Sequence, residues 1–240
     1  MKDCLKDLVE HTFDLGCIDL VKIVGDTDTT EVSALAEDLS VVVQAKFHNP
    51  VADFVGTFGM PNLGKLKTLL NLQEYREDAK LSITRRTTGD PDGINFENKA
   101  GDFKNNYRFM TSGVVNEKLK TATFRVPPWH IEFEPANAAI QRLKWQMSAN
   151  AEEPNFQAKT ENGDLKFFFG DHSTHAGNFV FQAGVTGQLK RTWSWPAKQF
   201  ASIMDLTGDK IVRISDDGAA MITVDSGLAV YNYILPAQSK

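Results

Sequence analysis

A short segment with two histidines and an aspartate offers the most metal-like chemistry in this sequence. Asp171, His172 and His175 lie within five residues of one another, and side chains of these types can bind zinc. The segment is flanked by glycines, no further ligand lies nearby, and the chain has only 5 His in all. This pattern is more typical of a polar surface loop, so we expect no metal site.

A pair of carboxylates offers acid–base chemistry. Glu132 and Glu134 flank Phe133, so they share one face of a predicted strand. Two such groups could hydrolyse a glycan, with the nearby Trp129 as a sugar platform, or they could form the solvated face of an edge strand. The sequence has no nucleophile elbow, Walker loop or dinucleotide fingerprint. We therefore expect no enzyme and no cofactor, and the hydrolase remains an alternative.

Three tryptophans could contact a ligand. Trp193 and Trp195 alternate along a predicted strand, where they could stack on sugars or bases or simply pack against the fold. Trp145 falls opposite the apolar stripe of its predicted helix and beside Arg142. It could belong to a contact surface or pack against a neighbouring strand.

Three segments contain basic residues and no acidic ones, although the chain is acidic. Lys and Arg total 26 against 31 Asp and Glu, a net charge of -5. Residues 56–73, 135–151 and 192–204 are each predicted to contain an amphipathic helix. Their predicted solvent-facing basic residues are Lys65, Lys67, Arg142, Lys144 and Lys198. Acid-free helices in an acidic chain predict one electropositive surface that meets a polyanion such as nucleic acid.

The composition favours a globular protein over a membrane-spanning or disulfide-rich one. The chain has 240 residues, 42% of them hydrophobic, which is enough for a sizeable core. No apolar run approaches the length of a membrane span, and the N-terminus has no signal-peptide pattern. Cys4 and Cys17 give neither a disulfide framework nor a zinc site. These features predict a cytoplasmic protein with no membrane partner.

The order of predicted elements repeats in the two halves of the chain. A first helix over 2–15 precedes strands over 18–24 and 39–47, a helix that begins near Pro61, and further short strands. The second half repeats this order from a helix that begins near Pro135. We therefore predict an α+β fold of two similar domains with helices packed on antiparallel sheets. The predicted limits are 1–112, a connector over 113–127, and 128–240.

The element order and several local stretches resemble the DNA sliding clamps of the T-even phage type. The stretches are 54–71 with 81–98, 131–170, and 195–235. The terminal Tyr233-Ile234-Leu235-Pro236 is also similar to the Tyr-Leu-Ala-Pro end of eukaryotic and archaeal clamps. The resemblance covers nearly the whole chain, but it is one of pattern, since these clamps have no catalytic signature.

This resemblance implies a ring of three chains around double-stranded DNA, without sequence specificity. Helices would line the hole, and sheets would form the outside. The residues that would face DNA are Lys2, Lys6, Lys65, Lys67, Arg142, Lys144 and Lys198. The first helix departs from the pattern, because Asp3, Asp7, Glu10 and Asp14 are expected on its polar side.

The resemblance also implies protein partners. The ring would tether the replicative DNA polymerase for processive synthesis, and an ATP-dependent loader would open it in the cytoplasm of a host cell. A partner pocket would comprise Val114, Val115, Leu119, Tyr233, Leu235 and Pro236. Subunit contact would involve edge strands that contain Tyr107, Phe109, Phe179 and Phe181. The alternative is a phage structural or glycan-binding β-rich protein with exposed aromatic residues.

Overall fold

The computed structural model describes residues 1–120, 126–170 and 175–238. Its contacts divide the chain into two compact units. Unit 1 comprises Met1–Thr123 and Ser226–Tyr231, and unit 2 comprises Phe124–Asp225 and Asn232–Lys240. The strand pairs described below are antiparallel, and helices pack on the sheets, which makes the fold α+β as predicted. The domain limits inferred from the sequence stay predictions.

Unit 1 begins with a helix and a sheet. The helix α1 (Lys2–Glu10) is followed by the short 3-10 helix η1 (Phe13–Leu15). Four strands follow in the spatial order β4-β1-β2-β3. They are β1 (Leu20–Gly25), β2 (Thr30–Leu35), β3 (Val42–Phe47) and β4 (Gly56–Pro61), with the 3-10 turn η2 (Ala52–Phe54) before β4. Alternate residues of β2 and β3 are buried, as expected for strands that cover a core on one face.

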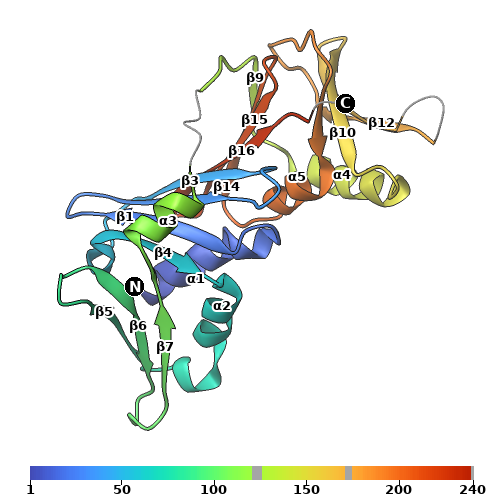
Figure 1. Ribbon diagram of the computed structural model, residues 1–240. Helices are drawn as coiled ribbons and strands as arrows, with labels where there is room; N and C mark the ends of the chain where they lie inside the picture. Colours follow the sequence, from blue (N-terminus) through green and yellow to red (C-terminus); the bar gives the residue numbers. More distant parts are fainter. Residues whose placement is uncertain (121–125, 171–174, 239–240) are drawn as a thin grey trace. The chain divides into compact units, whose positions relative to one another are not determined.

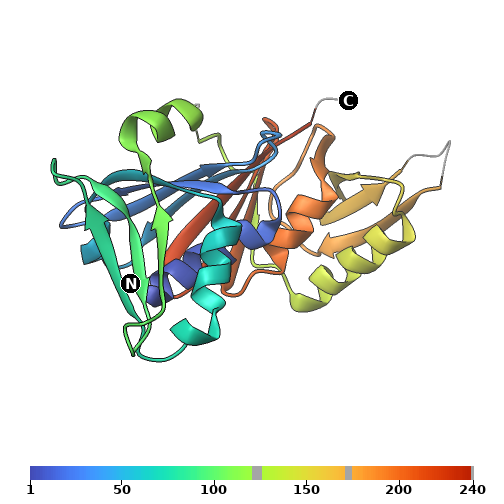
Figure 2. The same cartoon turned by 60° about the horizontal axis from the view of Figure 1, so that its bottom comes forward.

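The remainder of unit 1 forms a helix, a second sheet and a short helix. The elements are α2 (Leu63–Asn71), η3 (Gln73–Tyr75), β5 (Lys80–Arg85), β6 (Pro91–Glu97), β7 (Lys104–Arg108), β8 (Met110–Thr111) and α3 (Ser112–Lys118). The strands β5-β6-β7 form one sheet, whereas β8 pairs with β4. Figure 2 shows α1 and α2 on one side of the β1–β4 sheet and α3 on the other.

Unit 2 repeats this plan. Its elements are β9 (Ile131–Phe133), α4 (Asn137–Ala149), β10 (Asn155–Glu161), β11 (Asp164–Phe169), β12 (Gly177–Gln182), β13 (Trp193–Pro196), α5 (Ala197–Met204), β14 (Asp209–Ser215), β15 (Ala219–Asp225) and β16 (Ala229–Pro236). The last strand is shared, since its first three residues belong to unit 1. Figure 1 shows α4 and α5 side by side.

The main part of the strand topology repeats in the two units. In unit 1 the fourth strand, β4, pairs antiparallel with the first strand, β1, and Met60 lies opposite Val21. In unit 2 the fourth strand after α4 likewise pairs with the first strand after α4, with Trp195 of β13 opposite Phe156 of β10. Each unit then continues with a helix and three successive neighbouring strands, β5–β7 after α2 and β14–β16 after α5. The short strands differ between the units, since β8 pairs with β4 and β9 pairs with β14. The repeated order of elements predicted from the sequence therefore corresponds to a repeated topology.

The cores of the two units differ in composition. In unit 1, leucines of α1 and α2 and β-branched residues of β1–β3 fill the space between helices and sheet. In unit 2, an aromatic cluster lies between α5 and the β10–β12 strands. Phe167 stacks on Phe181 at 4.3 Å between ring centroids, and Phe200 of α5 meets Phe156 edge-on at 5.0 Å. Aromatic pairs of this geometry add to the free energy gained by burial.

Several sequence-based boundaries were wrong. Residues 56–60, in a segment predicted to contain an amphipathic helix, form β4 together with Pro61, which ends that strand instead of opening a helix. The strand β2 was missed altogether. The first part of the predicted connector forms α3, which packs on β4 because Gly59 has no side chain: a Cβ there would lie 2.8 Å from Val115 Cγ2.

Among the described residues, we find no helix with the length and apolar character needed to cross a lipid bilayer.

Candidate nucleic-acid interface

Three helices of the structure contain no acidic residue: α2, α4 and α5. The helix α2 shows how the sequence positions its cations. Leu63, Leu66 and Leu70 are buried, whereas Lys65 is exposed. The helix begins at Asn62, whose side-chain oxygen accepts a hydrogen bond from the backbone N–H of Lys65 at 3.3 Å. This N-cap satisfies a backbone N–H of the first turn, and the buried leucine stripe leaves Lys65 on the solvent side.

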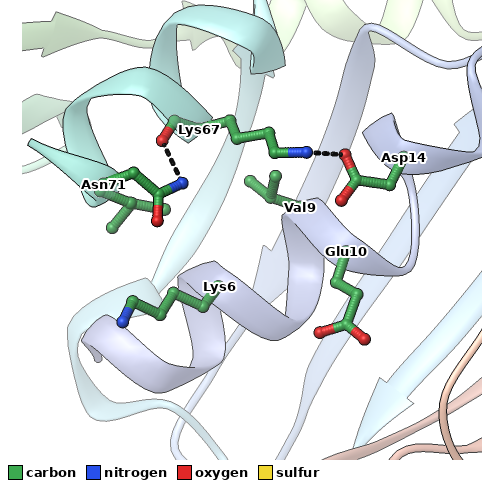
Figure 3. A pocket seen from close by; sticks show the side chains of 7 residues that line it. Lys6, Val9, Glu10, Asp14, Lys67 and Asn71 are labelled. Atoms are coloured by element: carbon green, nitrogen blue, oxygen red, sulfur yellow. Dashed lines mark hydrogen bonds and ion pairs between the residues drawn. The ribbon is translucent and has the colours of Figure 1, made fainter.

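Lys67 of α2 forms an ion pair with an acidic residue outside the helix. Its Nζ lies 2.6 Å from Oδ1 of Asp14, in η1, and 5.9 Å from the centre of the Phe13 ring. The pair lies at one side of a hollow of about 340 Å³ between α1 and α2, which Lys6 and Glu10 also line. Figure 3 shows the Lys67–Asp14 contact across this hollow. Lys6 and Lys67, both predicted to face DNA, therefore line the same hollow. The carboxyl groups of Glu10 and Asp14 line it too and offset their positive charge.

Lys2 serves the fold of unit 1. Its Nζ donates hydrogen bonds to the backbone carbonyl oxygens of Tyr75 and, at 3.0 Å, of Arg76. These carbonyls end η3, so the ammonium group caps that turn. Partial burial, with the nearby Lys6 as a smaller cause, lowers the pKa of Lys2 from its ordinary value.

Asp7 corrects the sequence-based picture of α1. It was expected on the polar side of the helix, where it would repel DNA, but it is buried. Its Oδ2 accepts a hydrogen bond from the Tyr231 hydroxyl at 2.7 Å, and the ring of His11 stacks on Tyr231 at 4.6 Å. Tyr231 lies 224 residues away in the sequence, so no local pattern could have indicated this contact.

In unit 2, α4 presents its basic residues on two flanks. Ile140 and Leu143 are buried. Arg142 is exposed, with its guanidinium 5.4 Å from the centre of the Phe179 ring in β12. On the other flank, Lys144 Nζ lies 2.5 Å from Oδ1 of Asp205, the residue that caps the C-terminus of α5.

Trp145 and Lys198 complete the exposed face of α4 and α5. Trp145 is 68% exposed, so of the two possibilities left open by the sequence, the described part of unit 2 favours a contact surface over packing against a neighbouring strand. Lys198 is exposed in the first turn of α5, whereas Phe200, Ile203 and Met204 of that helix are buried. In unit 2 the structure thus brings Arg142, Lys144 and Trp145 together on one helix.

The other tryptophans have structural roles. Trp195 is buried, and its Nε1 donates a hydrogen bond to the carbonyl oxygen of Leu235 at 3.1 Å. Trp193 donates to the carbonyl oxygen of Asp216 at 2.8 Å and covers the turn at Gly218. These contacts account for both rings without a ligand.

The paired carboxylates lie at a sheet edge. Glu132 is in β9, the edge strand beside β14, and its Oε2 lies 2.5 Å from Nε of Arg213. Glu134 is exposed beyond the end of the strand. This arrangement agrees with a solvated strand face. Of the metal-like segment, Asp171 and His172 lie outside the described residues, and the described ones contain no group of three or more His, Cys, Asp or Glu placed to hold a metal ion.

The predicted partner residues are mostly buried. In unit 1, Val115 and Leu119 of the α3 region are buried and Val114 is 45% exposed. In unit 2, Tyr233 and Leu235 are buried, whereas Pro236 is exposed. Only Val114 and Pro236 therefore offer accessible side chains.

The predicted subunit-contact residues belong to the cores of their own units. Tyr107 and Phe109 are buried in unit 1, where Phe109 stacks on Phe58 at 4.4 Å. Phe179 and Phe181 are buried in the aromatic cluster of unit 2. Tyr107 lies in β7 and Phe179 and Phe181 lie in β12, and both strands are at the edges of their sheets, whereas Phe109 lies just after β7. In β12, the carbonyl oxygens of Asn178 and Val180 accept hydrogen bonds from Gln146 and Arg142 of α4, at 3.5 and 3.4 Å.

Comparison with solved structures shows which fold this is. PCNA from Thermococcus kodakaraensis is similar with a TM-score of 0.66 and 11% identity, over 99% of this chain and 97% of that one. PCNA of A. fulgidus, solved with the C-terminal region of FEN-1 bound, is similar with a TM-score of 0.69 and 9% identity, over 100% and 97% of the two chains. No family model and no curated protein matches the sequence. The chain has the fold of PCNA, the DNA-clamp fold, along its entire length.

Proposed function

We propose that this protein is a DNA sliding clamp that encircles duplex DNA and tethers a DNA polymerase. The observation that carries the proposal is the absence of acidic residues from α2, α4 and α5 in a chain of net charge -5 with the DNA-clamp fold. Helices with basic and no acidic residues suit contact with a polyanion, while the negative net charge of the whole chain disfavours non-specific contacts with nucleic acid elsewhere.

The proposed mechanism requires no chemical reaction. A closed ring holds DNA topologically, so each phosphate contact can be weak and independent of base sequence. Lys65, Arg142 and Lys198 are exposed and suit such contacts. Lys67 and Lys144 have carboxyl partners in the free protein, and exposed pairs of this kind exchange readily because they are worth only about 0–1 kcal/mol.

A ring of three chains would form by antiparallel pairing of the edge strand β7 with the edge strand β12 of the next chain. Both strands lie at the edge of a sheet, and closure into a ring would remove these exposed edges. The cores beneath the paired strands would hold these strands in position. They include the buried side chains of Tyr107, Phe109, Phe179 and Phe181.

Polymerase tethering would raise the enzyme's effective concentration at the primer end. Val114 of unit 1 and Pro236 of unit 2 are the accessible residues among those proposed to contact partners, and a short apolar peptide of the polymerase suits exposed side chains of this kind. We further propose that an ATP-dependent loader opens the ring, and that the protein is of the T-even phage type and acts in the cytoplasm of a host cell.

Topological retention on DNA tests the function. The protein at high concentration is threaded onto linear duplex DNA, and the biotinylated ends are then blocked with streptavidin. We expect it to stay on blocked DNA in high salt and to leave when the duplex is cut. Loss in high salt from blocked and open DNA alike would mean ordinary charge-driven binding and would contradict encirclement.

A further inference from the structure

Trp145 is the most exposed of the large hydrophobic side chains among the described residues, at 68%. Of the other tryptophans, Trp195 is buried and Trp129 and Trp193 are partly covered. A tryptophan that lies open on a helix gives up the free energy of burial, and exposed aromatic groups of this kind are enriched at contact surfaces. This ring therefore suits a partner outside its own unit.

The position of Trp145 on α4 is central to the exposed face. At about 100° per residue, it lies across the helix from the buried Leu143. Gln141, one turn before it, and Ser148, three residues after it, are both exposed. The indole ring therefore lies in the middle of the solvent-exposed face of α4, where a partner molecule can contact it.

The charges around Trp145 indicate the chemistry of that partner. Arg142 lies on one flank of this face and Lys144 on the other, and α4 contains no acidic residue. Asp205 brings a carboxyl group into contact with this face, where it is paired with Lys144 at 2.5 Å. This face of α4 has a basic side chain on each side of an exposed aromatic ring. Such a face suits a partner that has both negative charges and flat apolar surfaces.

We propose that Trp145 contacts duplex DNA directly, with its indole ring against a deoxyribose at the wall of a groove and its N–H donating to a phosphate oxygen. This inference rests on the proposed clamp function and adds to it an aromatic contact that reads no base edge. Sugar and phosphate are the same at every base pair, so the contact permits movement along the duplex. The Trp145 contact would raise the affinity for DNA and slow sliding along it, without any preference for base sequence.

Tryptophan fluorescence tests the contact. A duplex of about 30 base pairs, three turns, is titrated into the protein at low salt, and emission is compared with that of Trp145→Phe. We expect DNA to quench the wild-type emission and this quenching to disappear in Trp145→Phe. In a separate binding assay, Trp145→Ala should bind DNA at least about fivefold more weakly. The control Val126→Ala, another exposed apolar residue, should bind as the wild type does.

The outcomes separate this inference from the proposed function. If the wild type is retained on blocked DNA but its Trp145 emission does not change and Trp145→Ala binds normally, the aromatic contact is wrong and the clamp function stands. If the wild type neither binds duplex DNA nor stays on blocked DNA, both are wrong. If the Trp145 emission shifts with protein concentration in the absence of DNA, a second copy of the chain covers the ring, which also overturns the contact.

Discussion

The Nζ atom of Lys144, on α4, lies 2.5 Å from Oδ1 of Asp205, the residue that ends α5. Unit 1 has a similar pair, Lys67 on α2 with Asp14 in η1, at 2.6 Å. In each unit, an acid just outside one helix neutralises a lysine on an acid-free helix. The positive faces are therefore weaker in the free protein than their sequences indicate, which favours loose contact with DNA over tight binding.

Removal of these two acids should tighten DNA binding. In Asp14→Asn with Asp205→Asn, Lys67 and Lys144 lose their partners and become available to phosphates. We expect the magnitude of the salt-dependence slope to rise by up to about 1.8, that is, about 0.9 for each of two added phosphate contacts. The folding free energy should change by less than about 1 kcal/mol, because both pairs are exposed. DNA binding measured across a series of salt concentrations checks this.

A matched control is Asp78→Asn, which removes an acid from the exposed pair with Lys99, outside the helices in question. It should leave the salt dependence unchanged. Since this control removes one acid and the double variant removes two, an increase in log affinity about half as large as that of the double variant would mean that only net charge matters, not the location of the acids.

Charge reversal on the helices should abolish retention on DNA. Lys65, Arg142 and Lys198 are exposed, so their replacement by Glu should leave the fold intact and repel phosphates from three helices. The expected result is an unchanged midpoint of thermal unfolding and loss of retention on end-blocked duplex. A control with the same charge change outside α1, α2, α4 and α5 is Lys99, Lys118 and Lys190 to Glu. Equal loss in both variants would rule out the assignment of these helices to the DNA surface.

The helix faces were predictable from the sequence, whereas their neutralisation was not. Leucines at three- and four-residue spacing fix which side of α2 is buried, and so the exposure of Lys65 follows from local sequence alone. Asp14 lies 53 residues from Lys67, and such a pair depends on how α1 and α2 pack. Likewise, Asp7 was placed on the polar side of α1 because it is charged, although a distant tyrosine hydroxyl makes its burial possible.

The strand errors have a similar cause. Residues 56–61 include Gly56 and Gly59, which weaken any local strand pattern, and they form β4 because they pair with β1 on one side and β8 on the other. The partner residues were inferred from resemblance at the chain's end, but resemblance does not indicate exposure. Leu235 is fully buried and only Pro236 is accessible.

That difference in burial predicts distinct phenotypes for two neighbouring residues. Pro236→Ala should reduce processive synthesis by the cognate polymerase without lowering the free energy of unfolding, since its side chain is exposed. Leu235→Ala should lower that free energy by about 2–5 kcal/mol through the cavity it leaves. Primed-circle synthesis and denaturant unfolding measure the two effects. Normal processivity of Pro236→Ala together with Val114→Ala would remove the proposed partner site.

The buried contact between Tyr231 and Asp7 should matter for stability alone. Tyr231→Phe keeps the ring stacked on His11 but removes the hydroxyl that donates to the Asp7 carboxyl. Loss of a buried hydrogen bond should lower the free energy of unfolding by about 1–3 kcal/mol, with DNA binding unchanged. Tyr75→Phe is the comparison, because its partner Asn105 is only partly buried and can turn to water. A loss no larger than that of Tyr75→Phe would contradict the structural importance of the contact.

Strand pairing between chains can be captured by disulfide formation. Asn106 in β7 and Asn178 in β12 are exposed on edge strands, and a disulfide requires the two Cα atoms to approach within about 7 Å. We expect protein with Asn106→Cys and Asn178→Cys, or with a neighbouring pair along the same edges, to form reducible species of up to three chains of 26.7 kDa each. Single-cysteine variants serve as controls, because Cys4 and Cys17 are present in all of them. If no pair along these two edges cross-links while the protein still forms an assembly, the ring closes through other strands.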